Sequence, residues 1–384
     1  MARVPTMKTA WEDHSWTGLP HLLGTKRTDV CVIGLGGSGL CAIGELLDHG
    51  VNVIGIDAAS VAGGAAGANG GFLLAGTARF YHHMRASLGG QRARQLYLLT
   101  VDEIDRVFAQ MPDIARRAGS LRIAMDDDEL ADCEAQFAVM QQDRLPVEKY
   151  SGPEGRGLLI PTDGVFNPLL RCRRLAEQCM QRGAQLFENS EVLEIRSGMV
   201  RAQQGMIRCK NILAAVDGKL ELLFPALNQR VRTARLQMLS TVPTNEVRIE
   251  RAVYARWGYE YWQQLADGRV VLGGFRDQAM EQEWTDSTEA TEIIQDKLTT
   301  FLRDHLKVSA PIEHRWAASV GYTDNGLPII DEITPNVWVV GGYNGTGNIV
   351  GALCGRGVAQ RIVGKPASII SLLSPVGASS EPLR

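Results

Sequence analysis

The sequence predicts a mixed α/β fold with an added antiparallel sheet, and three observations carry this expectation. An apolar run at residues 30–33 leads into closely spaced glycines, a helical pattern and a second apolar strand at residues 51–57. A similar strand, glycine loop and helix recurs near the C-terminus, from residue 337 to 363. Between them, residues 231–274 alternate apolar and polar side chains around a turn at Asp267-Gly268, as antiparallel strands do. At 384 residues the chain is expected to contain two domains.

The first glycine motif has the spacing and the surroundings of a dinucleotide-binding turn. Gly34, Gly36 and Gly39 form GxGxxG directly after a β-branched strand, and an amphipathic helical pattern follows. The first glycine allows a tight turn, the second lets a pyrophosphate approach the backbone, and the third lets the helix pack on the strand. The N-terminal N–H groups of the helix are expected to receive the phosphates. Asp57 ends the second strand, where an acid binds the adenosine ribose. The alternative is an accidental glycine turn.

A run of very small side chains follows at residues 61–71, and it cannot build a core by itself. A flexible linker would usually contain more Ser, Lys or Glu and would not lead straight into Phe72. We therefore expect a tight loop whose backbone lies against something flat.

Further elements are predicted from the hydrophobic period and from residues that end helices and strands. Residues 125–150 are charged and mixed, which is typical of a peripheral element, and Gly364 is expected to cap the last helix. Helices are expected at residues 88–118, 169–183 and 292–305, and short strands at residues 184–187, 191–195 and 212–216.

Composition excludes several classes of function. With 40 basic and 43 acidic residues the formal charge is −3, so neither nucleic acid nor an anionic membrane is an expected partner. No stretch is apolar over the length of a membrane span, and residues 1–28 contain no apolar core of a signal peptide. The 7 cysteines include no CxxC pair, which favours small buried thiols in a reducing compartment. We expect a cytoplasmic protein; the sequence leaves the oligomeric state open.

The C-terminal glycine loop indicates the cofactor. Its helix N-terminus offers a second set of N–H groups and partial positive charge, which an NAD enzyme does not need. FAD needs it because the isoalloxazine lies far from the adenosine, and a positive dipole near N1 and the C2 carbonyl stabilises the anionic reduced ring. The alternative is a glycine turn that only caps a helix.

With these motifs in order, the chain resembles the D-amino-acid oxidase superfamily of FAD-dependent amine oxidoreductases. The pattern is most similar to the glycine oxidase and gamma-glutamylputrescine oxidase branch, and the resemblance extends from Thr28 to Lys365. The matching stretches are residues 29–34, 66–71, 267–274, Trp316 with 323–330, and 341–348.

The resemblance implies a Rossmann-like FAD-binding domain made of residues 28–88, 156–228 and 310–365. It implies a substrate domain made of residues 89–155 and 229–309, with an N-terminal extension at 1–27 and a C-terminal tail at 366–384. The motif glycines would hold the pyrophosphate, residues 68–71 would pass along the isoalloxazine, Val192 would meet the adenine, and residues 345–348 would face the pyrimidine edge. The expected cofactor-binding residues are Gly34, Gly36, Gly37, Ser38, Gly39, Asp57, Ala58, Gly64, Ala65, Ala68, Asn69, Gly70, Gly71, Val192, Ala215, Gly342, Gly345, Thr346, Gly347 and Asn348.

Two departures from the family pattern fall in residues 315–321. Some relatives tether flavin through a cysteine there, and this chain has none, so its FAD is expected to be noncovalent. The alpha-amino-acid oxidases also carry an arginine in that stretch that binds the substrate carboxylate. Small apolar residues follow Trp316 here, which argues against an alpha-amino acid held in the usual way.

Arg276 is the candidate replacement for that arginine. It follows the strand at residues 269–275, and a guanidinium binds a carboxylate through two N–H groups. The alternative is a surface arginine paired with Asp277. Tyr259 and Tyr261 are expected to share one face of the preceding strand, with Trp262 on the other. Tyr343, in the loop that would face the flavin, completes the candidate catalytic set.

The resemblance implies oxidation of a primary or secondary amine, including amines with a distal carboxylate. A hydride passes to flavin N5, the imine hydrolyses, and O2 or another acceptor reoxidises the flavin; no general base is assigned. Alternatives are an NAD-dependent oxidoreductase and a flavin-binding protein without activity. No metal is expected, because His82-His83 is interpreted as an exposed pair rather than a metal pattern.

Overall fold

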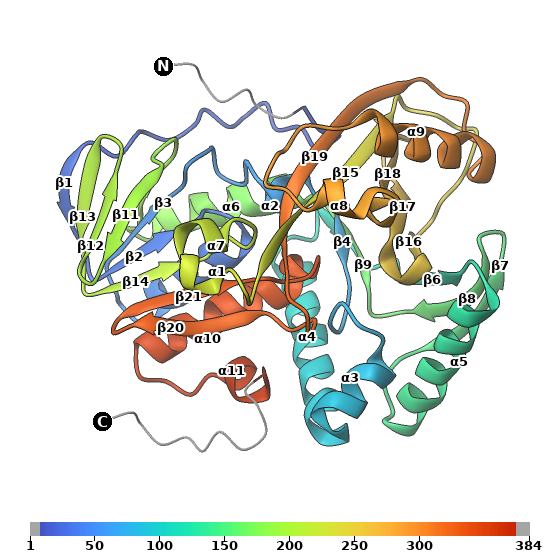
Figure 1. Cartoon of the computed structure of the whole chain (residues 1–384), viewed down its shortest axis with the longest axis horizontal. Coiled ribbons are helices and arrows are strands. Elements are labelled where there is room, and N and C mark those ends of the chain that lie inside the picture. Colours follow the sequence, from blue (N-terminus) through green and yellow to red (C-terminus); the bar gives the residue numbers. More distant parts are fainter. Residues whose placement is uncertain (1–7, 374–384) are drawn as a thin grey trace.

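A computed structural model describes residues 8–373, which fold into four sheets and their covering helices (Figure 1). The six-stranded sheet has the order β10-β3-β2-β14-β21-β20. All of its pairings are parallel except β20 with β21. Its strands are β2 (Val30–Ile33), β3 (Val53–Ile56), β10 (Gln185–Phe187), β14 (Asn211–Ala214), β20 (Ile329–Thr334) and β21 (Val337–Gly341).

Both faces of this sheet are covered, which explains why its central strands are continuously apolar. Val30 and Val32 point into a core shared with the helices, whereas Cys31 and Ile33 point into a core on the other face. The helices are α1 (Gly37–Asp48), α6 (Pro168–Gln181) and α10 (Ala352–Ile362). The opposite cover is a four-stranded sheet of β1 (Gly24–Arg27), β13 (Gly205–Arg208), β12 (Met199–Ala202) and β11 (Val192–Arg196).

The largest sheet has eight strands in the order β19-β15-β18-β17-β16-β6-β8-β7 (right-hand side of Figure 1). The expected antiparallel strands are present, and Gly268 forms the turn between β17 and β18 with φ +92°. The pairing of β16 with β6 is parallel, so the sheet is not purely antiparallel. Its strands are β6 (Ser120–Ala124), β7 (Glu148–Gly152), β8 (Gly155–Ile160), β15 (Arg232–Thr241), β16 (Ala252–Ala255), β17 (Glu260–Gln264), β18 (Val270–Gly274) and β19 (Ile312–Tyr322).

The expectation of one helix at residues 88–118 is wrong. Gly89, with φ +81°, separates α3 (Tyr81–Leu88) from α4 (Gly90–Gln110), and the chain is extended again by residue 115. A small sheet is formed there by β4 (Phe72–Leu73), β9 (Gly164–Phe166) and β5 (Ala115–Arg116). The charged segment after it contains α5 (Asp127–Gln142), which packs near α3.

Shorter elements complete the chain. The helix expected at 292–305 is α9 (Glu292–Thr300) continued by a π-turn, η4 (Phe301–His305). The others are α2 (Ala65–Ala68), α7 (Leu220–Leu223), η1 (Pro225–Leu227), η2 (Arg256–Gly258), η3 (Arg276–Ala279), α8 (Met280–Glu283), η5 (Gly347–Gly351) and α11 (Ser368–Leu373).

The sheets divide the chain differently from the segment boundaries expected above. β19 lies within the segment 310–365 but pairs along its length with β15, so it belongs to the eight-stranded sheet. The N-terminal extension is also integrated, since β1 pairs with β13 and Trp11 is buried. Residues 1–7 of the extension and 374–384 of the tail lie outside the described part of the chain.

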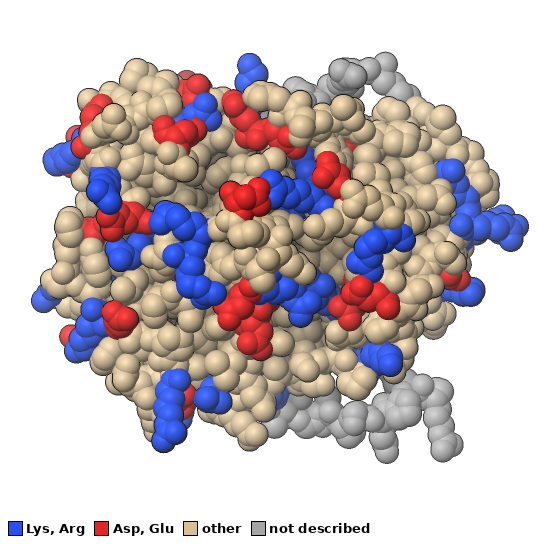
Figure 2. Space-filling model, turned by 180° about the vertical axis from the view of Figure 1, so that it is seen from behind, with Lys and Arg blue, Asp and Glu red and all other residues tan. Residues whose placement is uncertain are grey.

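The surface carries both signs of charge. On the face seen in Figure 2, basic and acidic side chains alternate over short distances and no large area has one sign. Within residues 8–373, no helix has the length and apolar character that crossing a membrane requires.

Candidate functional site

The glycine turn between β2 and α1 has the geometry expected of an anion-binding turn. A Cβ on Gly34 would lie 2.5 Å from the Ala215 carbonyl oxygen, and one on Gly39 would lie 1.9 Å from the Gly34 carbonyl oxygen. The fold itself therefore requires glycine at these two positions. Gly36 is the N-cap of α1, where no side chain caps the helix and no acid stands in the first turn. The first N–H groups of α1 are thus available to a bound anion.

Asp57 follows β3 beside this turn, and its carboxylate is fixed by backbone donors. Its two oxygens accept hydrogen bonds from the N–H groups of Leu35 at 2.7 Å and Ala59 at 2.9 Å. Burial raises the pKa of Asp57 to about 6, against the effect of these donors, and nearby Glu188 adds to the rise. Ribose hydroxyls would supply further donors to the same carboxylate.

The small-residue loop that contains α2 is held through its carbonyl oxygens. The Trp316 indole donates to the Ala68 carbonyl at 2.8 Å, and the Trp11 indole donates to the Asn69 carbonyl at 2.8 Å. The Gln263 amide donates to the Gly70 carbonyl. These donors come from β19, the N-terminal segment and β17, so both the extension and the eight-stranded sheet position the loop.

Asn69 also joins this loop to the C-terminal glycine loop. Its amide nitrogen donates to Asn348 Oδ1 at 3.1 Å, and its Oδ1 accepts from Asn348 Nδ2 at 3.0 Å. Asn348 Nδ2 donates in addition to the Phe72 carbonyl at 3.0 Å. From α6, the buried Arg171 donates to the Asn348 carbonyl oxygen at 2.8 Å. The two loops expected to meet the flavin are therefore fixed to each other.

The C-terminal loop turns sharply after β21. Asp217 accepts hydrogen bonds from the N–H groups of Tyr343 at 2.9 Å and Gly321 at 3.3 Å, and burial raises its pKa to about 6. The Tyr343 hydroxyl donates to Ser38 at the start of α1 at 2.8 Å. The structure therefore places Tyr343 between the two glycine motifs, where its hydroxyl is committed to Ser38. The chain after this loop begins as the π-turn η5 before α10.

The other expected cofactor residues line the same region or its edge. Gly37 and Ser38 begin α1, Ala58 and Gly64 are exposed, and Val192 begins β11 in the four-stranded sheet. Gly345 has φ +86° with open space where a side chain would be. The remaining positions lie in α2, at the end of β14 or in the C-terminal loop, and they are Ala65, Ala215, Gly342, Thr346 and Gly347.

Tyr261 and Trp262 lie on opposite faces of β17, as expected. The Tyr261 ring would contact a Cβ on Gly70 at 3.3 Å, whereas Trp262 is buried against α9 and η4. Burial raises the pKa of Tyr261, so its hydroxyl stays protonated. Tyr259 does not lie on the strand: it ends the turn η2 with helical backbone angles. The two tyrosines therefore do not share a strand face.

Arg276 begins η3, after Phe275 turns the chain with φ +63°. It does not pair with Asp277, which is bound instead by Arg256. Its guanidinium carbon lies 4.5 Å from the ring centre of Tyr322 and 4.8 Å from that of Trp284. Among residues 8–373, no carboxylate lies within ion-pair distance of Arg276. Its polar neighbours are Met280 Sδ, 2.9 Å from Nη1, and the Tyr322 hydroxyl.

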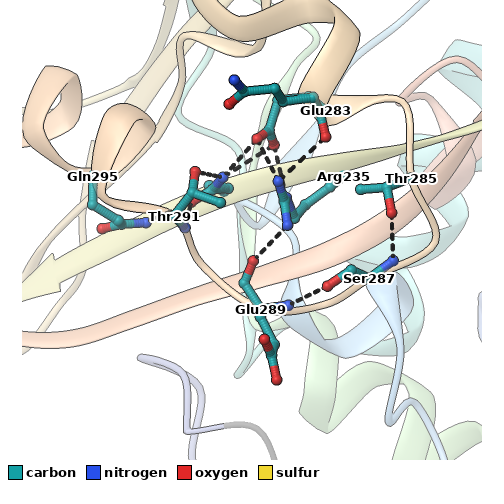
Figure 3. A network of polar contacts seen from close by, with 9 residues as sticks. Arg235, Glu283, Thr285, Ser287, Glu289, Thr291 and Gln295 are labelled. Atoms are coloured by element: carbon teal, nitrogen blue, oxygen red, sulfur yellow. Dashed lines mark hydrogen bonds and ion pairs between the residues drawn. The ribbon is translucent and has the colours of Figure 1, made fainter.

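A buried ion pair between Arg235 and Glu283 stands next to Trp284 in the chain, and Figure 3 shows the pair. Glu283 accepts from Arg235 Nη2 at 2.7 Å and Nε at 3.0 Å, and both side chains are less than a tenth exposed. Gln237 donates to the same carboxylate at 3.0 Å, which satisfies the pair further. This network fixes α8 on β15 and with it the indole against which Arg276 lies.

His82 and His83 are not an exposed pair as expected. The His82 side chain is 16% exposed, its Nε2 lies 3.4 Å from Asp132 Oδ1, and its ring packs on that of His83. Asp132 lies on α5, so local sequence could not bring it to the histidines.

Sequence reasoning missed the residues that hold the loops and surround Arg276. Their partners lie far away along the chain, and no local motif marks them. The residues are Trp11, Arg171, Glu188, Arg235, Gln263, Glu283, Trp284 and Tyr322.

Comparisons with known proteins agree with this geometry. "Gamma-glutamylputrescine oxidoreductase" of Escherichia coli is 26% identical, covering 88% of this chain and 84% of its own. "Probable oxidoreductase OrdL" of Haemophilus influenzae is 24% identical, covering 90% and 85%. Solved structures with the same fold include glycine oxidase from Geobacillus kaustophilus (TM-score 0.73, 18% identity, covering 88% and 95%) and L-proline dehydrogenase from P. horikoshii (TM-score 0.71, 18% identity, covering 92% and 96%).

The uncapped start of α1, the partly buried Asp57 and the two joined loops fit the pyrophosphate, ribose and ring of FAD. The family model described as FAD dependent oxidoreductase (DAO) matches residues 29–361. The match decides for FAD and against the NAD-dependent alternative. The chain thus belongs to the DAO family of FAD-dependent oxidoreductases, and the expected resemblance is confirmed.

Proposed function

We propose that this protein oxidises a primary or secondary amine that also carries an anionic group, with Arg276 binding the anion. The observation that carries the proposal is the state of this guanidinium. It is partly buried among aromatic rings, and no carboxylate of the described chain neutralises it. A partly buried guanidinium without a counter-charge favours binding of an anion, so a substrate carboxylate is the natural partner.

The position of Arg276 suits this role. Gly273, three residues before it, pairs with Tyr261. The Tyr261 ring lies close to Gly70, in the small-residue loop at residues 61–71 that we expect to meet the flavin. Tyr261 donates no hydrogen bond within the described chain, so its protonated hydroxyl is free to orient a substrate. Tyr322 lies against Arg276, and burial raises its pKa, so it too remains a hydrogen-bond donor.

When bound, FAD would supply the hydride acceptor, at flavin N5, for the substrate carbon next to the amine. The side chains of the protein would bind and orient the substrate and exclude water. Arg276 would anchor the distal anion, Tyr261 would orient the molecule beside the flavin loop, and the buried Trp316 and Met238 would exclude water. The imine product then hydrolyses in water. No side chain is assigned as a general base.

The relatives support this substrate class. One curated relative is named for gamma-glutamylputrescine, and solved neighbours are named for glycine and L-proline oxidation. Small apolar residues follow Trp316 in β19, so a carboxylate would have to be bound elsewhere in this chain. The same stretch contains no cysteine, which supports noncovalent FAD, and the cytoplasm remains the proposed location.

Anaerobic titration tests the proposal. Each member of an amine panel, with and without a distal carboxylate, is added to the FAD-loaded protein while the flavin absorbance near ~450 nm is followed. Bleaching by an anionic amine and weaker bleaching by its neutral amide are expected. If no amine bleaches the flavin, the protein is a flavin binder without this activity. If an amine does bleach the flavin, the rate at which O2 or another acceptor restores the absorbance identifies the acceptor.

A further inference from the structure

We infer that His82, His83 and Asp132 form a binding site for a divalent transition-metal ion such as Zn2+, separate from the flavin site. His82 and His83 lie in the first turn of α3, and Asp132 lies on α5. The candidate ligand atoms of the three residues lie within 4.8 Å of one another. Two imidazoles and one carboxylate are a donor set that suits zinc, with a water molecule as fourth ligand.

The distances fit a single tetrahedral ion. Ligand atoms about 2.0–2.1 Å from zinc stand about 3.3 Å apart from each other. His82 Nε2 lies 3.4 Å from Asp132 Oδ1, which matches that separation. His83 Nε2 lies 4.0 Å from the same oxygen, and its half-exposed ring can turn inward. The solvent beside His83 provides the entry path and the fourth ligand.

The carboxylate is oriented for such a role. Asp132 Oδ2 accepts a hydrogen bond from the Trp257 indole at 2.7 Å, which leaves Oδ1 directed at the histidines. A hydrogen bond to the other oxygen of a ligating carboxylate is the usual outer support of a metal site.

Further contacts connect the elements around the three residues. One turn before Asp132, Glu129 accepts hydrogen bonds from the N–H groups of Arg256 at 2.9 Å and Trp257 at 2.8 Å. Both of these residues have left-handed backbone angles, so the turn η2 depends on α5. Phe80 packs against the two imidazoles from the other side. An ion here would tie α3, α5 and η2 together.

The test is calorimetric titration of ZnCl2 into tag-free, FAD-loaded, chelator-treated full chain. One Zn2+ per chain is expected, with at least about tenfold weaker binding in His83→Gln and in Asp132→Asn. His83→Gln is the primary variant because the side chain is 51% exposed and its loss should not disturb folding. Asn at position 132 can still accept the Trp257 hydrogen bond.

The matched control is His49→Gln, which removes a histidine that also lies near a carboxylate, 3.7 Å from Glu45. This variant should bind Zn2+ as the parent does. The inference is overturned if the parent binds no Zn2+, or if His83→Gln binds it within about twofold of the parent. Neither readout involves an amine, so the result is independent of the proposed function. If Asp132→Asn fails to fold, His83→Gln alone decides.

Discussion

The side-chain amides of Asn69 and Asn348 hydrogen-bond each other in both directions, at 3.1 and 3.0 Å, across 279 residues of chain. The pair connects the loop after β3 to the loop after β21, the two segments that we expect to lie along the flavin. Arg171 supports it by binding the Asn348 carbonyl oxygen. We therefore expect cofactor binding and the joining of the two loops to depend on the same contacts.

Replacing Asn348 with Leu should weaken both. The change removes both hydrogen bonds between Asn69 and Asn348 and takes the Asn348 donor from the Phe72 carbonyl, which costs about 1–3 kcal/mol. We expect a lower melting temperature and a clear loss of FAD affinity, measured by thermal unfolding and by flavin fluorescence. Asn245→Leu, at an exposed loop position, is the control. Unchanged FAD affinity in Asn348→Leu would mean that the pair serves folding alone.

Gly36→Val should abolish FAD binding while the apoprotein still folds. A Cβ at Gly36 meets only the Ala66 Cβ, at 3.0 Å, so the fold can accommodate a side chain there. The same side chain would occupy the space that the pyrophosphate needs. Gly44→Ala, in the same helix with nothing within 4 Å, should retain full flavin content. Flavin content is read from the absorbance spectrum of the purified variants. If Gly36→Val has the same flavin content as the parent, the glycine motif is only a structural turn and does not bind the pyrophosphate.

FAD affinity should fall as the pH drops through about 6. Burial raises the pKa of Asp57 to about 6 in the free protein, and ribose hydroxyls favour its charged form. FAD binding therefore releases a proton below that pH, and affinity declines by up to about tenfold per pH unit. Dissociation constants at about pH 8 and about pH 5 measure the effect. Asp57→Asn should flatten the profile, and an equally steep profile in that variant would assign the proton elsewhere.

The same group affects the stability of the apoprotein in the opposite direction. Because the folded pKa is raised above 3.8, protonated Asp57 contributes stability that is present below pH 3.8 and is lost as the pH rises through about 6. Bound FAD should reduce this loss.

Acid precipitation should release FAD intact and leave a colourless pellet. No cysteine occupies residues 315–321, and Trp316 of that stretch is committed to the Ala68 carbonyl. The supernatant is checked by its flavin spectrum and by mass. Yellow colour that stays with the washed pellet would reveal a covalent link.

The sequence allowed prediction of those parts of the site that are local. Gly34, Gly36, Gly39 and Asp57 stand within one strand-turn-helix-strand unit, and their backbone demands are visible in the residues themselves. The alternation that separated Tyr261 from Trp262 is equally local. The same alternation gave the wrong place for Tyr259, because this residue ends the turn η2 and β17 begins one residue later.

Long-range pairing could not be predicted in this way. Asp277 is adjacent to Arg276, yet it binds Arg256, because η2 brings that guanidinium nearer. The prediction of one helix at 88–118 did not take account of Gly89. Its positive φ ends α3, and α4 begins after it. The hydrogen bond from the Trp11 indole to the Asn69 carbonyl and the approach of Asp132 to His82 are tertiary contacts. Neither the hydrophobic period nor the motif spacing of the sequence indicates them.

The most direct test of the account is the kinetics of Arg276→Lys on the best anionic amine and on its neutral amide. A lysine is a point charge and cannot reproduce the paired N–H geometry of a guanidinium. We predict that kcat/KM for the anionic amine falls about ten to one hundred and fifty fold, while that for the neutral amide changes little. Flavin content and melting temperature should stay at parental values, as they should in the control Arg248→Lys, an exposed arginine. Kinetics within about twofold of the parent on the anionic amine, or equal losses on both substrates, would contradict the anion-binding role of Arg276.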